Sequence, residues 1–355
     1  MSHVVFFLHG FDGRPKEFKQ MVRIFDAKFG ERMKLHACTS FHGQTHHGGG
    51  AGARLVAAEM QQTMHEHRCD RVSVVCHSFG GIVMAWALKL LDDSGTFSGV
   101  RLVNYVACAT PFLGIRGSMG GQMLGGLIKM WCTSTREMCL SDENFEGSRM
   151  PFLRRVAEPD VLMVLGRFRR RALYACVQGD LQVGYESASM SSIACDARSL
   201  KLSAEWPHIS AESAHGGRDH RPNASEHGST SPPAPRHASS LSFLWSRSDS
   251  ASPSSSSASP TGGKASESQW LARDVKREII REILSGYRTL SWERADCLFG
   301  YATLGDLLAA PFAHEQIVGK VLGGMMEDSR GKDVLDHLVT RFEVADGGEG
   351  TTMLI

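Results

Sequence analysis

A serine that lies between a strand-like segment and a helix-like segment constrains the fold of this chain more than any other feature. Residues 71–91 read RVSVVCHSFGGIVMAWALKLL, with β-branched valines before Cys-His-Ser-Phe-Gly-Gly and an apolar helical pattern after it. Ser78 therefore falls at a strand-to-helix turn, which can hold a serine with its hydroxyl exposed. Small neighbours are needed there, and Gly80 and Gly81 supply them on one side, whereas Cys76 stands where the usual motif has glycine. The chain thus carries a near match, Cys-x-Ser-x-Gly, to a turn that displays a nucleophilic serine.

Composition limits the functions that this chain can have. Its 355 residues with 42% hydrophobic content can bury a sizeable core in one or two domains, and a net charge of +1 gives no reason to expect nucleic acid as a partner. The nine cysteines show neither CxxC nor paired Cys/His spacing, so neither a disulfide framework nor a zinc site is indicated. We expect a reducing compartment, no metal and no organic cofactor.

Membrane attachment through a spanning helix is not expected from the sequence. The apolar run at residues 4–8 is too short for a signal peptide, and no stretch approaches the roughly 18 consecutive apolar residues of a membrane span. The final residues carry no prenylation cysteine. We therefore expect a soluble cytoplasmic protein, with peripheral attachment to membranes or lipid droplets left open.

The N-terminal block predicts a strand over residues 4–8, a turn beginning His9-Gly10-Phe11, and a helix. In serine hydrolases of this order, a backbone N–H just after an early strand pairs with the N–H after the nucleophile to form an oxyanion hole. Here these would be the amides of Phe11 and Phe79. A plain turn is the alternative interpretation of His-Gly.

The next block predicts a strand at residues 34–37, a glycine-rich loop and a helix over 54–65. His42, His46 and His47 lie in that loop without a carboxylate or thiolate partner in the sequence nearby, so a polar loop bordering the substrate cleft is a better interpretation than a metal site. The apolar positions of the predicted helix are Leu55, Val56, Met60 and Met64.

Two later segments each leave an alternative open. After a predicted strand at 99–107, residues 117–131 are rich in glycine and methionine, which suits either a flap over an active site or a loop that covers the core. Residues 149–171 are rich in arginine, which indicates a solvated face, with attraction to anionic lipid headgroups as the alternative.

A carboxylate and a histidine follow in the order that a catalytic triad needs. Asp180 ends a predicted strand after Gly179, and His314 lies in a late loop between a final strand and a closing helix over residues 333–342. Serine is a poor nucleophile unless an oriented base removes its proton, and the order Ser78, Asp180, His314 is the one found in α/β-hydrolases. The competing acids are Asp160 and Asp296, and the competing bases are His77 and His337.

Residues 203–268 shift to Ser, Pro, His, Gly and Ala with hardly any aliphatic side chains. Such a segment buries too little apolar area to offset the cost of ordering the backbone, about 1–2 kcal/mol per residue, so we expect a disordered insertion. The predicted organisation is a hydrolase domain in two parts, 1–202 and 269–345, separated by the insertion at 203–268 and followed by a tail at 346–355. The sequence leaves open whether the insertion binds a protein partner.

These blocks together resemble the lipase-like putative serine esterase family, the domain of unknown function 676, an α/β-hydrolase group related to Rog-type lipases. The resemblance is carried by VVFFLHGFDG, VVCHSFGGIV, ATPFLG, RRRALYACVQGDLQVGYESASM, SWERADCLF and AHEQIV. It implies a mostly parallel sheet flanked by helices, and the triad Ser78, Asp180 and His314. The chain departs from the family pattern at Cys76, Phe79, Phe112 and Glu315.

The resemblance also implies a reaction. We expect hydrolysis of an acyl ester, of a glycerolipid or a lysophospholipid, through an acyl-Ser78 intermediate. A thioesterase, an acyltransferase or a peptidase would use the same triad, since a fold does not fix a substrate. A catalytically weak or silent scaffold, whose insertion binds partners, is the alternative from another class.

Overall fold

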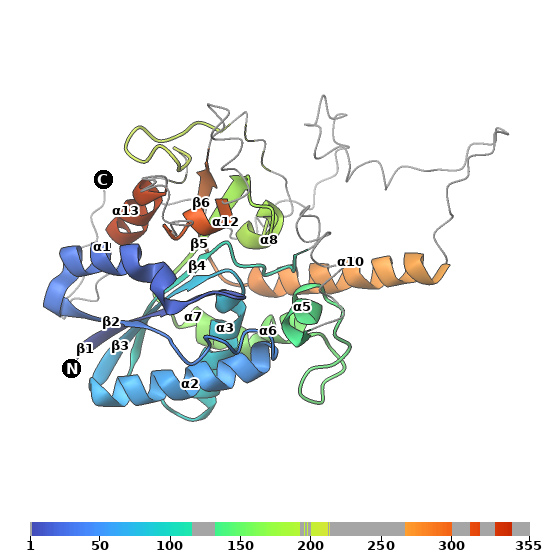
Figure 1. The fold of residues 1–355 in the computed structure, drawn as a ribbon. Coiled ribbons are helices and arrows are strands. Elements are labelled where there is room, and N and C mark those ends of the chain that lie inside the picture. Colours follow the sequence, from blue (N-terminus) through green and yellow to red (C-terminus); the bar gives the residue numbers. More distant parts are fainter. Residues whose placement is uncertain are drawn as a thin grey trace. The chain divides into compact units, whose positions relative to one another are not determined.

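A parallel sheet of six strands organises the protein, in a computed structural model that describes residues 2–115, 132–191, 195, 197, 200–211, 213, 267–299, 313–319 and 331–342 (Figure 1). The strand order is β2-β1-β3-β4-β5-β6, and every neighbouring pair is parallel. The proposed flap at 117–131 lies outside the described residues. The strands are β1 (Ser2–Leu8), β2 (Met33–Ala37), β3 (Cys69–His77), β4 (Arg101–Cys108), β5 (Arg170–Gln178) and β6 (Glu293–Leu298).

The strand order creates a switch point between β1 and β3. The chain leaves β1 toward β2 on one side and returns to β3 on the other side of β1. In open parallel sheets, ligands bind outside the carboxyl ends of the strands at such a point, because the connecting loops diverge there. The segments that follow β1 and β3 are His9-Gly10-Phe11 and the Ser78 turn, so the fold brings the two predicted parts of the site to one place.

Helices cover both faces of the sheet (Figure 1). On one face α1 packs against α13, and on the other α3 packs against α2, α6 and α7. The helices are α1 (Lys19–Phe29), α2 (Gly49–Glu66), α3 (Phe79–Asp93), α5 (Thr133–Met138), α6 (Phe152–Val156), α7 (Pro159–Gly166), α8 (Tyr185–Ser189), α10 (Glu267–Tyr287), α12 (Ala313–Gln316) and α13 (Lys332–Thr340), with short 3₁₀ turns at Pro15–Phe18 and Gly30–Arg32.

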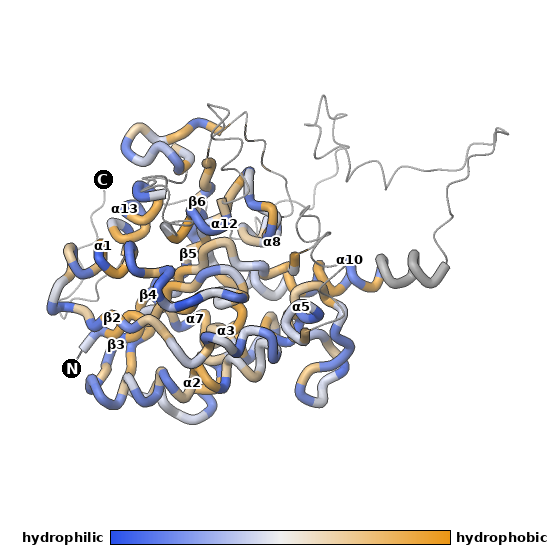
Figure 2. Tube along the Cα trace, in the orientation of Figure 1, coloured by the Kyte–Doolittle hydropathy of each residue, from blue (hydrophilic) through white to orange (hydrophobic). Residues whose placement is uncertain are grey.

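The core under α1 and α13 follows from their amphipathic sequences. Figure 2 shows hydrophobic and hydrophilic residues alternating along both helices, as expected when one face is buried. Phe25 of α1 packs edge-on against Phe7 of β1 and Phe342, with ring centroids 5.5 and 4.7 Å apart. The inward positions predicted for the closing helix are confirmed, since all are buried: Val334, Leu335, Leu338 and Phe342.

The start of α2 differs from the sequence prediction. The helix begins at Gly49 rather than Arg54, because its glycines allow aromatic rings to approach the backbone closely. A Cβ at Gly49 would lie 2.0 Å from the Phe152 ring, and one at Gly52 would lie 2.4 Å from the Phe41 ring. Of the apolar positions of this helix, Val56, Met60 and Met64 are buried, whereas Leu55 is 41% exposed.

The beginning of the predicted insertion also differs from the prediction. Ile209 forms an antiparallel bridge with Cys297 of β6 and is fully buried, and Trp206 is 8% exposed. These two apolar side chains bury enough surface to hold this short stretch on the edge strand. Residues 214–266, the greater part of the predicted insertion, lie outside the described residues.

The chain divides into two compact units. One consists of residues 1–221 and 280–355 and contains the whole sheet, and the other consists of residues 222–279, of which the described part belongs to α10. Among the residues that the structure describes, no helix combines the length and the apolar character needed to cross a bilayer.

Candidate active site

Ser78 occupies the turn that the sequence predicts, between the last residue of β3 and the first residue of α3. Its backbone is strained for a residue with a side chain, with φ 53° and ψ −136°. The Ser78 amide donates a hydrogen bond of 2.8 Å to the carbonyl of Cys108 at the end of β4, which anchors the turn to the sheet. The Ser78 residue is 8% exposed.

Two glycines make this turn possible by close approach. A Cβ at Gly80 would lie 2.4 Å from the carbonyl oxygen of His9, so only glycine lets the start of α3 pack against the end of β1. A Cβ at Gly10 would lie 2.6 Å from Ser78 Cβ and 3.1 Å from Ser78 Oγ. The loop after β1 therefore passes directly against the serine, which is the contact that the predicted oxyanion hole requires.

The two predicted oxyanion donors each follow one residue of this contact in the chain, Phe11 after Gly10 and Phe79 after Ser78. Phe79 is the first residue of α3, so its N–H is one of the donors that a helix N-terminus leaves without an intrahelical acceptor. Phe11 follows Gly10 in the loop that crosses Ser78. His9 shapes the same loop: its Nδ1 donates to the carbonyl of Gly10 at 3.0 Å, and burial lowers the pKa of His9, which favours the neutral ring.

Asp180 and His314 meet although 134 positions separate them in the sequence. His314 Nδ1 donates to Asp180 Oδ2 at 2.8 Å, and the two side chains are 3% and 2% exposed. Asp180 Oδ1 accepts the backbone N–H groups of Gln182 and Val183, each at 2.8 Å. Because Nδ1 carries the proton in this pair, Nε2 is left as the basic nitrogen of the neutral His314 ring.

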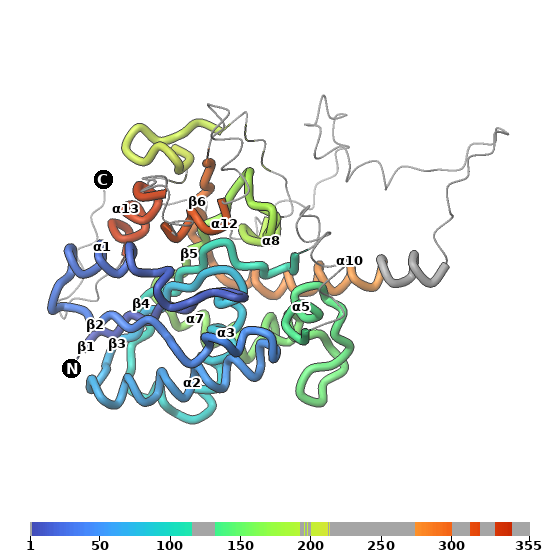
Figure 3. The backbone as a smooth tube through the Cα atoms, viewed as in Figure 1, coloured from blue at the N-terminus to red at the C-terminus, as the bar shows by residue number. Residues whose placement is uncertain are grey.

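The segment that carries His314 is a short helix rather than the predicted loop. This helix is α12, and it contacts residues of β5 and of the segment that follows β5. Gln182 Nε2 donates to Glu315 Oε1 at 2.8 Å, and the Cys176 thiol lies 3.5 Å from the carbonyl of Ala313. Figure 3 shows by colour that α12 comes from late in the chain, and it packs against β5 from the middle of the chain.

His77 joins the serine turn to α12. Its Nε2 donates to the backbone carbonyl of His314 at 2.7 Å, and the centroids of the two imidazole rings are 4.7 Å apart. His314 therefore lies next to the residue that immediately precedes Ser78. Sequence reasoning considered His77 as a competing base, whereas the structure shows it bound to the backbone of the other histidine.

The histidine-rich loop borders the same region. His46 Nε2 contacts Asp12 Oδ1 at 2.6 Å, and its ring lies 4.6 Å from that of Phe11. His42 Nδ1 is 3.4 Å from the carbonyl of Gly13. Two of the three loop histidines thus contact the segment that follows β1.

Sequence reasoning did not single out the one group of metal-ligating types that the described residues bring together. His36, Cys38 and Glu59 place their ligand atoms within 4.8 Å of one another. Glu59, however, already accepts His36 Nε2 at 2.9 Å and the amides of Thr39 and Ser40 at 2.8 and 2.9 Å. Burial alone would raise the pKa of Glu59, but these hydrogen bonds outweigh it and lower the pKa to about 2. Glu59 therefore holds the turn after β2.

The rival acids each serve another contact. Asp160 pairs with both terminal nitrogens of Arg155, at 2.8 and 2.7 Å, and this ion pair lowers the pKa of Asp160. Asp296 accepts the Tyr185 hydroxyl at 2.9 Å, and it forms an ion pair with Arg294, whose Nε lies 2.9 Å from its Oδ1. Neither carboxylate is bonded to a histidine in the part of the chain that the structure describes.

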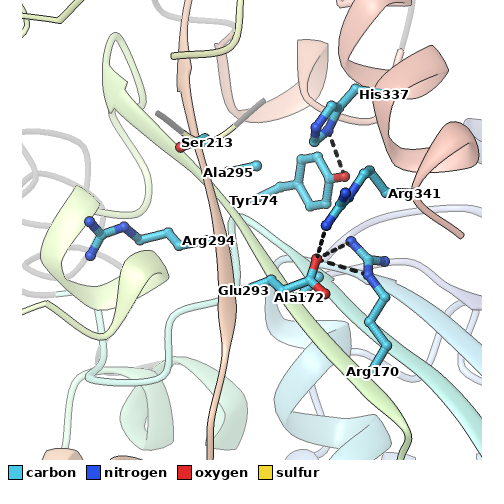
Figure 4. Close-up of a pocket in the computed structure, with 9 residues that line it drawn as sticks. All are labelled: Arg170, Ala172, Tyr174, Ser213, Glu293, Arg294, Ala295, His337 and Arg341. Carbon is cyan, nitrogen blue, oxygen red and sulfur yellow. Dashed lines mark hydrogen bonds and ion pairs between the residues drawn. The ribbon is translucent and has the colours of Figure 1, made fainter. Parts of the chain in front are cut away.

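The rival base His337 lies at a separate small cavity (Figure 4). Its Nδ1 is 2.9 Å from the Tyr174 hydroxyl. The cavity, of about 10 Å³, has room for about one water molecule and is bordered by Arg170 and Glu293, the first residues of β5 and β6. This cavity therefore lies where β5 and β6 begin, whereas Asp180 lies just after the carboxyl end of β5.

Arginines of the arginine-rich segment form ion pairs and donate hydrogen bonds to backbone carbonyls. Arg154 pairs with Glu158 and Glu282, and Arg167 pairs with Asp92. Arg171 donates to backbone carbonyls at the end of α7. These contacts explain the arginines as stabilisers of the fold, so the alternative of a lipid-headgroup surface gains no support from them.

Cys76 and the glycine of the usual motif differ in volume, and the structure shows where the extra side chain goes. Cys76 is fully buried on β3, beside Leu8 of β1 and Ala107 of β4. Burial raises the pKa of the Cys76 thiol well above its ordinary value, with the Cys38 and Cys108 thiols adding to the effect. The thiol therefore stays protonated and packs as a small apolar group.

Comparisons with known proteins agree with this architecture. A profile for the family described as "Putative serine esterase (DUF676)" matches residues 1–195. "Putative lipase YDL109C" of Saccharomyces cerevisiae is 27% identical over 202 residues, 53% of this chain and 30% of that protein. "Putative lipase C4A8.10" of Schizosaccharomyces pombe is 26% identical over 132 residues, 35% of this chain and 16% of that protein. The chain thus spans less than a third of the length of these curated relatives.

Solved structures that resemble the chain include two lipases. Aspergillus fumigatus lipase B has a TM-score of 0.37 and 15% identity, covering 57% of this chain and 44% of its own. Bacillus licheniformis lipase BlEst2 has a TM-score of 0.31 and 15% identity, covering 50% and 65%. The predicted architecture, a parallel sheet flanked by helices, is confirmed. Since the family profile covers more than half of the chain, the protein belongs to the family described as "Putative serine esterase (DUF676)".

Proposed function

We propose that this protein is a lipase-like serine esterase, and that Ser78, His314 and Asp180 are its nucleophile, base and orienting acid. The observation that carries the proposal is the buried hydrogen bond of 2.8 Å between His314 Nδ1 and Asp180 Oδ2, on a segment that His77 ties to the serine turn. An imidazole held in this tautomer can accept the serine proton at Nε2, because the carboxylate fixes the other proton at Nδ1.

The reaction proceeds in two steps, acylation of Ser78 and hydrolysis of the acyl-Ser78 ester. Ser78 Oγ attacks the acyl carbonyl carbon while His314 Nε2 takes its proton, and the alcohol leaves with that proton as the acyl-Ser78 ester forms. Water then attacks the ester, with His314 again accepting a proton and returning it to Ser78 as the fatty acid leaves. Asp180 stabilises the imidazolium in both steps. No step needs a metal or organic cofactor.

The amides of Phe11 and Phe79 stabilise the negative oxygen that develops in each step. Their positions follow from the close contact of Gly10 with Ser78 and from the start of α3. Each donor of this kind lowers the barrier by about 2.7–4 kcal/mol in other enzymes.

The substrate class is an acyl ester of a glycerolipid or a lysophospholipid. The family resemblance and the lipase names of the curated relatives support this choice. Contact with a lipid surface would then be peripheral.

Turnover of a soluble p-nitrophenyl ester tests the proposal. We expect activity in the wild-type protein and its loss in Ser78→Ala. Ser73→Ala is a matched control, because Ser73 lies on the same strand and bonds His3 Nε2 at 2.8 Å instead. Equal turnover by wild-type protein and Ser78→Ala would reject the assignment, and an inactive, well-folded wild-type protein would favour the scaffold alternative.

A further inference from the structure

His77 connects the nucleophile turn to the helix that carries the base, and we propose that it is a positioning residue that sets the distance between Ser78 and His314. The inference rests on the proposed function. It assigns a role in positioning the base to the residue before the nucleophile, His77.

The backbone of His77 is fixed by the sheet. His77 is the last residue of β3 and pairs in register with Cys108 of β4, and the next amide, that of Ser78, donates to the Cys108 carbonyl. The His77 side chain therefore projects from a position that cannot move without disturbing β4.

The helix α12 depends on such outside contacts. It has four residues, and so short a helix has almost no stability of its own, since the cost of nucleation exceeds what one turn returns. From the β5 side, Asp180 and Gln182 hold the side chains of His314 and Glu315. From the β3 side, His77 holds the backbone carbonyl of His314 at 2.7 Å.

These two sets of contacts constrain different parts of His314, its side chain and its backbone. Asp180 orients the His314 ring about its own axis, whereas the His77 bond fixes the His314 backbone relative to the strand that leads into Ser78. His77 and His314 are 4% and 2% exposed, so water does not compete well for this bond. Loss of the bond would let α12 move away from the serine turn without unfolding the sheet.

Three variants separate positioning from simple stability. His77→Phe keeps an aromatic ring against His314 but removes the donor, whereas His77→Gln keeps an N–H donor. His3→Phe is the matched control, because His3 is fully buried and its side chain bonds Ser73 within the same sheet. His3 lies near the start of β1, whereas the proposed active site lies beyond the end of that strand. The experiment measures kcat and KM for a soluble p-nitrophenyl ester, the thermal midpoint, and the downfield proton resonance of the His314–Asp180 bond.

We expect His77→Phe to lower kcat by about 10- to 100-fold with little change in KM, since misplacement of a catalytic group by about 1 Å has an effect of this size. His77→Gln should regain most of the lost kcat. His3→Phe should lower the thermal midpoint and leave kcat near the wild-type value. The downfield proton should broaden or shift in His77→Phe and persist in His3→Phe.

Either of two kinetic results would overturn the inference: an unchanged kcat in His77→Phe, or equal losses of kcat in His77→Phe and His77→Gln. Failure of the proposed function has a different signature, because the wild-type protein itself would then lack turnover. The proton resonance needs no substrate, so an unaltered resonance in His77→Phe would also reject the positioning role.

Discussion

Asp180 uses its two carboxylate oxygens for different partners, and this division determines the tautomer of His314. Oδ1 accepts the amides of Gln182 and Val183, and Oδ2 accepts His314 Nδ1–H. A substitution that keeps Oδ1 but replaces Oδ2 by an NH₂ group would leave the loop in place and present a donor to Nδ1. His314 would then shift its proton to Nε2, where it can no longer accept the serine proton.

We therefore predict that Asp180→Asn lowers kcat by about 10³- to 10⁴-fold, as loss of the orienting carboxylate does in other triads. The thermal midpoint should change little, because the two amide bonds to Oδ1 remain. Asp296→Asn is the control, since Asp296 accepts a hydrogen bond from Tyr185 and pairs with Arg294 rather than with a histidine. A loss of kcat below tenfold in Asp180→Asn would show that another acid orients the base.

At the scale of single elements, the close packing of α3 against the end of β1 requires a glycine at position 80. The carbonyl oxygens of His9 and Leu8 would lie 2.4 and 2.7 Å from a Cβ at Gly80, and backbone atoms cannot rotate away. We predict that Gly80→Ala lowers the free energy of unfolding by about 1–3 kcal/mol or more, the cost of overpacking a close contact. Chemical denaturation measures this difference.

Gly166→Ala provides the comparison for that measurement. Gly166 ends α7, and its added Cβ would meet only Leu290, at 3.4 Å, which is ordinary van der Waals contact. This substitution should leave stability unchanged or raise it slightly. If the two variants were equally stable, the close approach of α3 to β1 would not be a constraint on the fold.

A buried carboxyl group joins α5 to the start of α2. Glu137 is 3% exposed, and its Oε2 accepts the Gly49 amide at 2.7 Å. Burial, aided by Asp142, raises the pKa of Glu137 from its ordinary value of 4.5 to about 8. Because the folded state binds this proton more tightly than the unfolded state, the contribution to stability is complete below pH 4.5 and is lost as the pH rises toward 8.

We predict that Glu137→Gln reduces this pH dependence. A glutamine keeps an oxygen for the Gly49 amide and carries no charge, so the free energy of unfolding should fall less steeply with pH between about 4.5 and 8 than in the wild-type protein. Glu143→Gln, at an exposed position, controls for the loss of one negative charge. Parallel pH curves for wild-type protein and Glu137→Gln would contradict the prediction.

At the scale of the whole molecule, the parts of the fold that the sequence predicted are those set by local pattern. Residues close together in the sequence determine the structure of three such parts: valine-rich β3, the turn with glycines after Ser78, and the apolar face of α13. The strand before Asp180 was predicted for the same reason, and the structure ends it at Gln178. Strand-to-helix order then constrained the sheet, because parallel strands need helical crossovers.

The parts that local pattern missed depend on contacts between distant residues. Glycines at the start of α2 suggested a loop, but they belong to a helix because Phe152 and Phe41 pack onto them. Ile209 looked like part of a polar insertion, and only its pairing with Cys297 keeps it in the fold. The bonds of His77 to His314, and of Gln182 to Glu315, join residues more than 130 positions apart and have no local signal.

The identity of the reactive side chain remains the central claim about the whole molecule. Treatment with a fluorophosphonate, which phosphonylates an activated serine, followed by peptide mass spectrometry, identifies that side chain directly. We predict a single modification in the peptide that contains Ser78, abolished in Ser78→Ala and slowed in His77→Phe. Modification of a different residue, or no modification of the folded protein, would contradict the account.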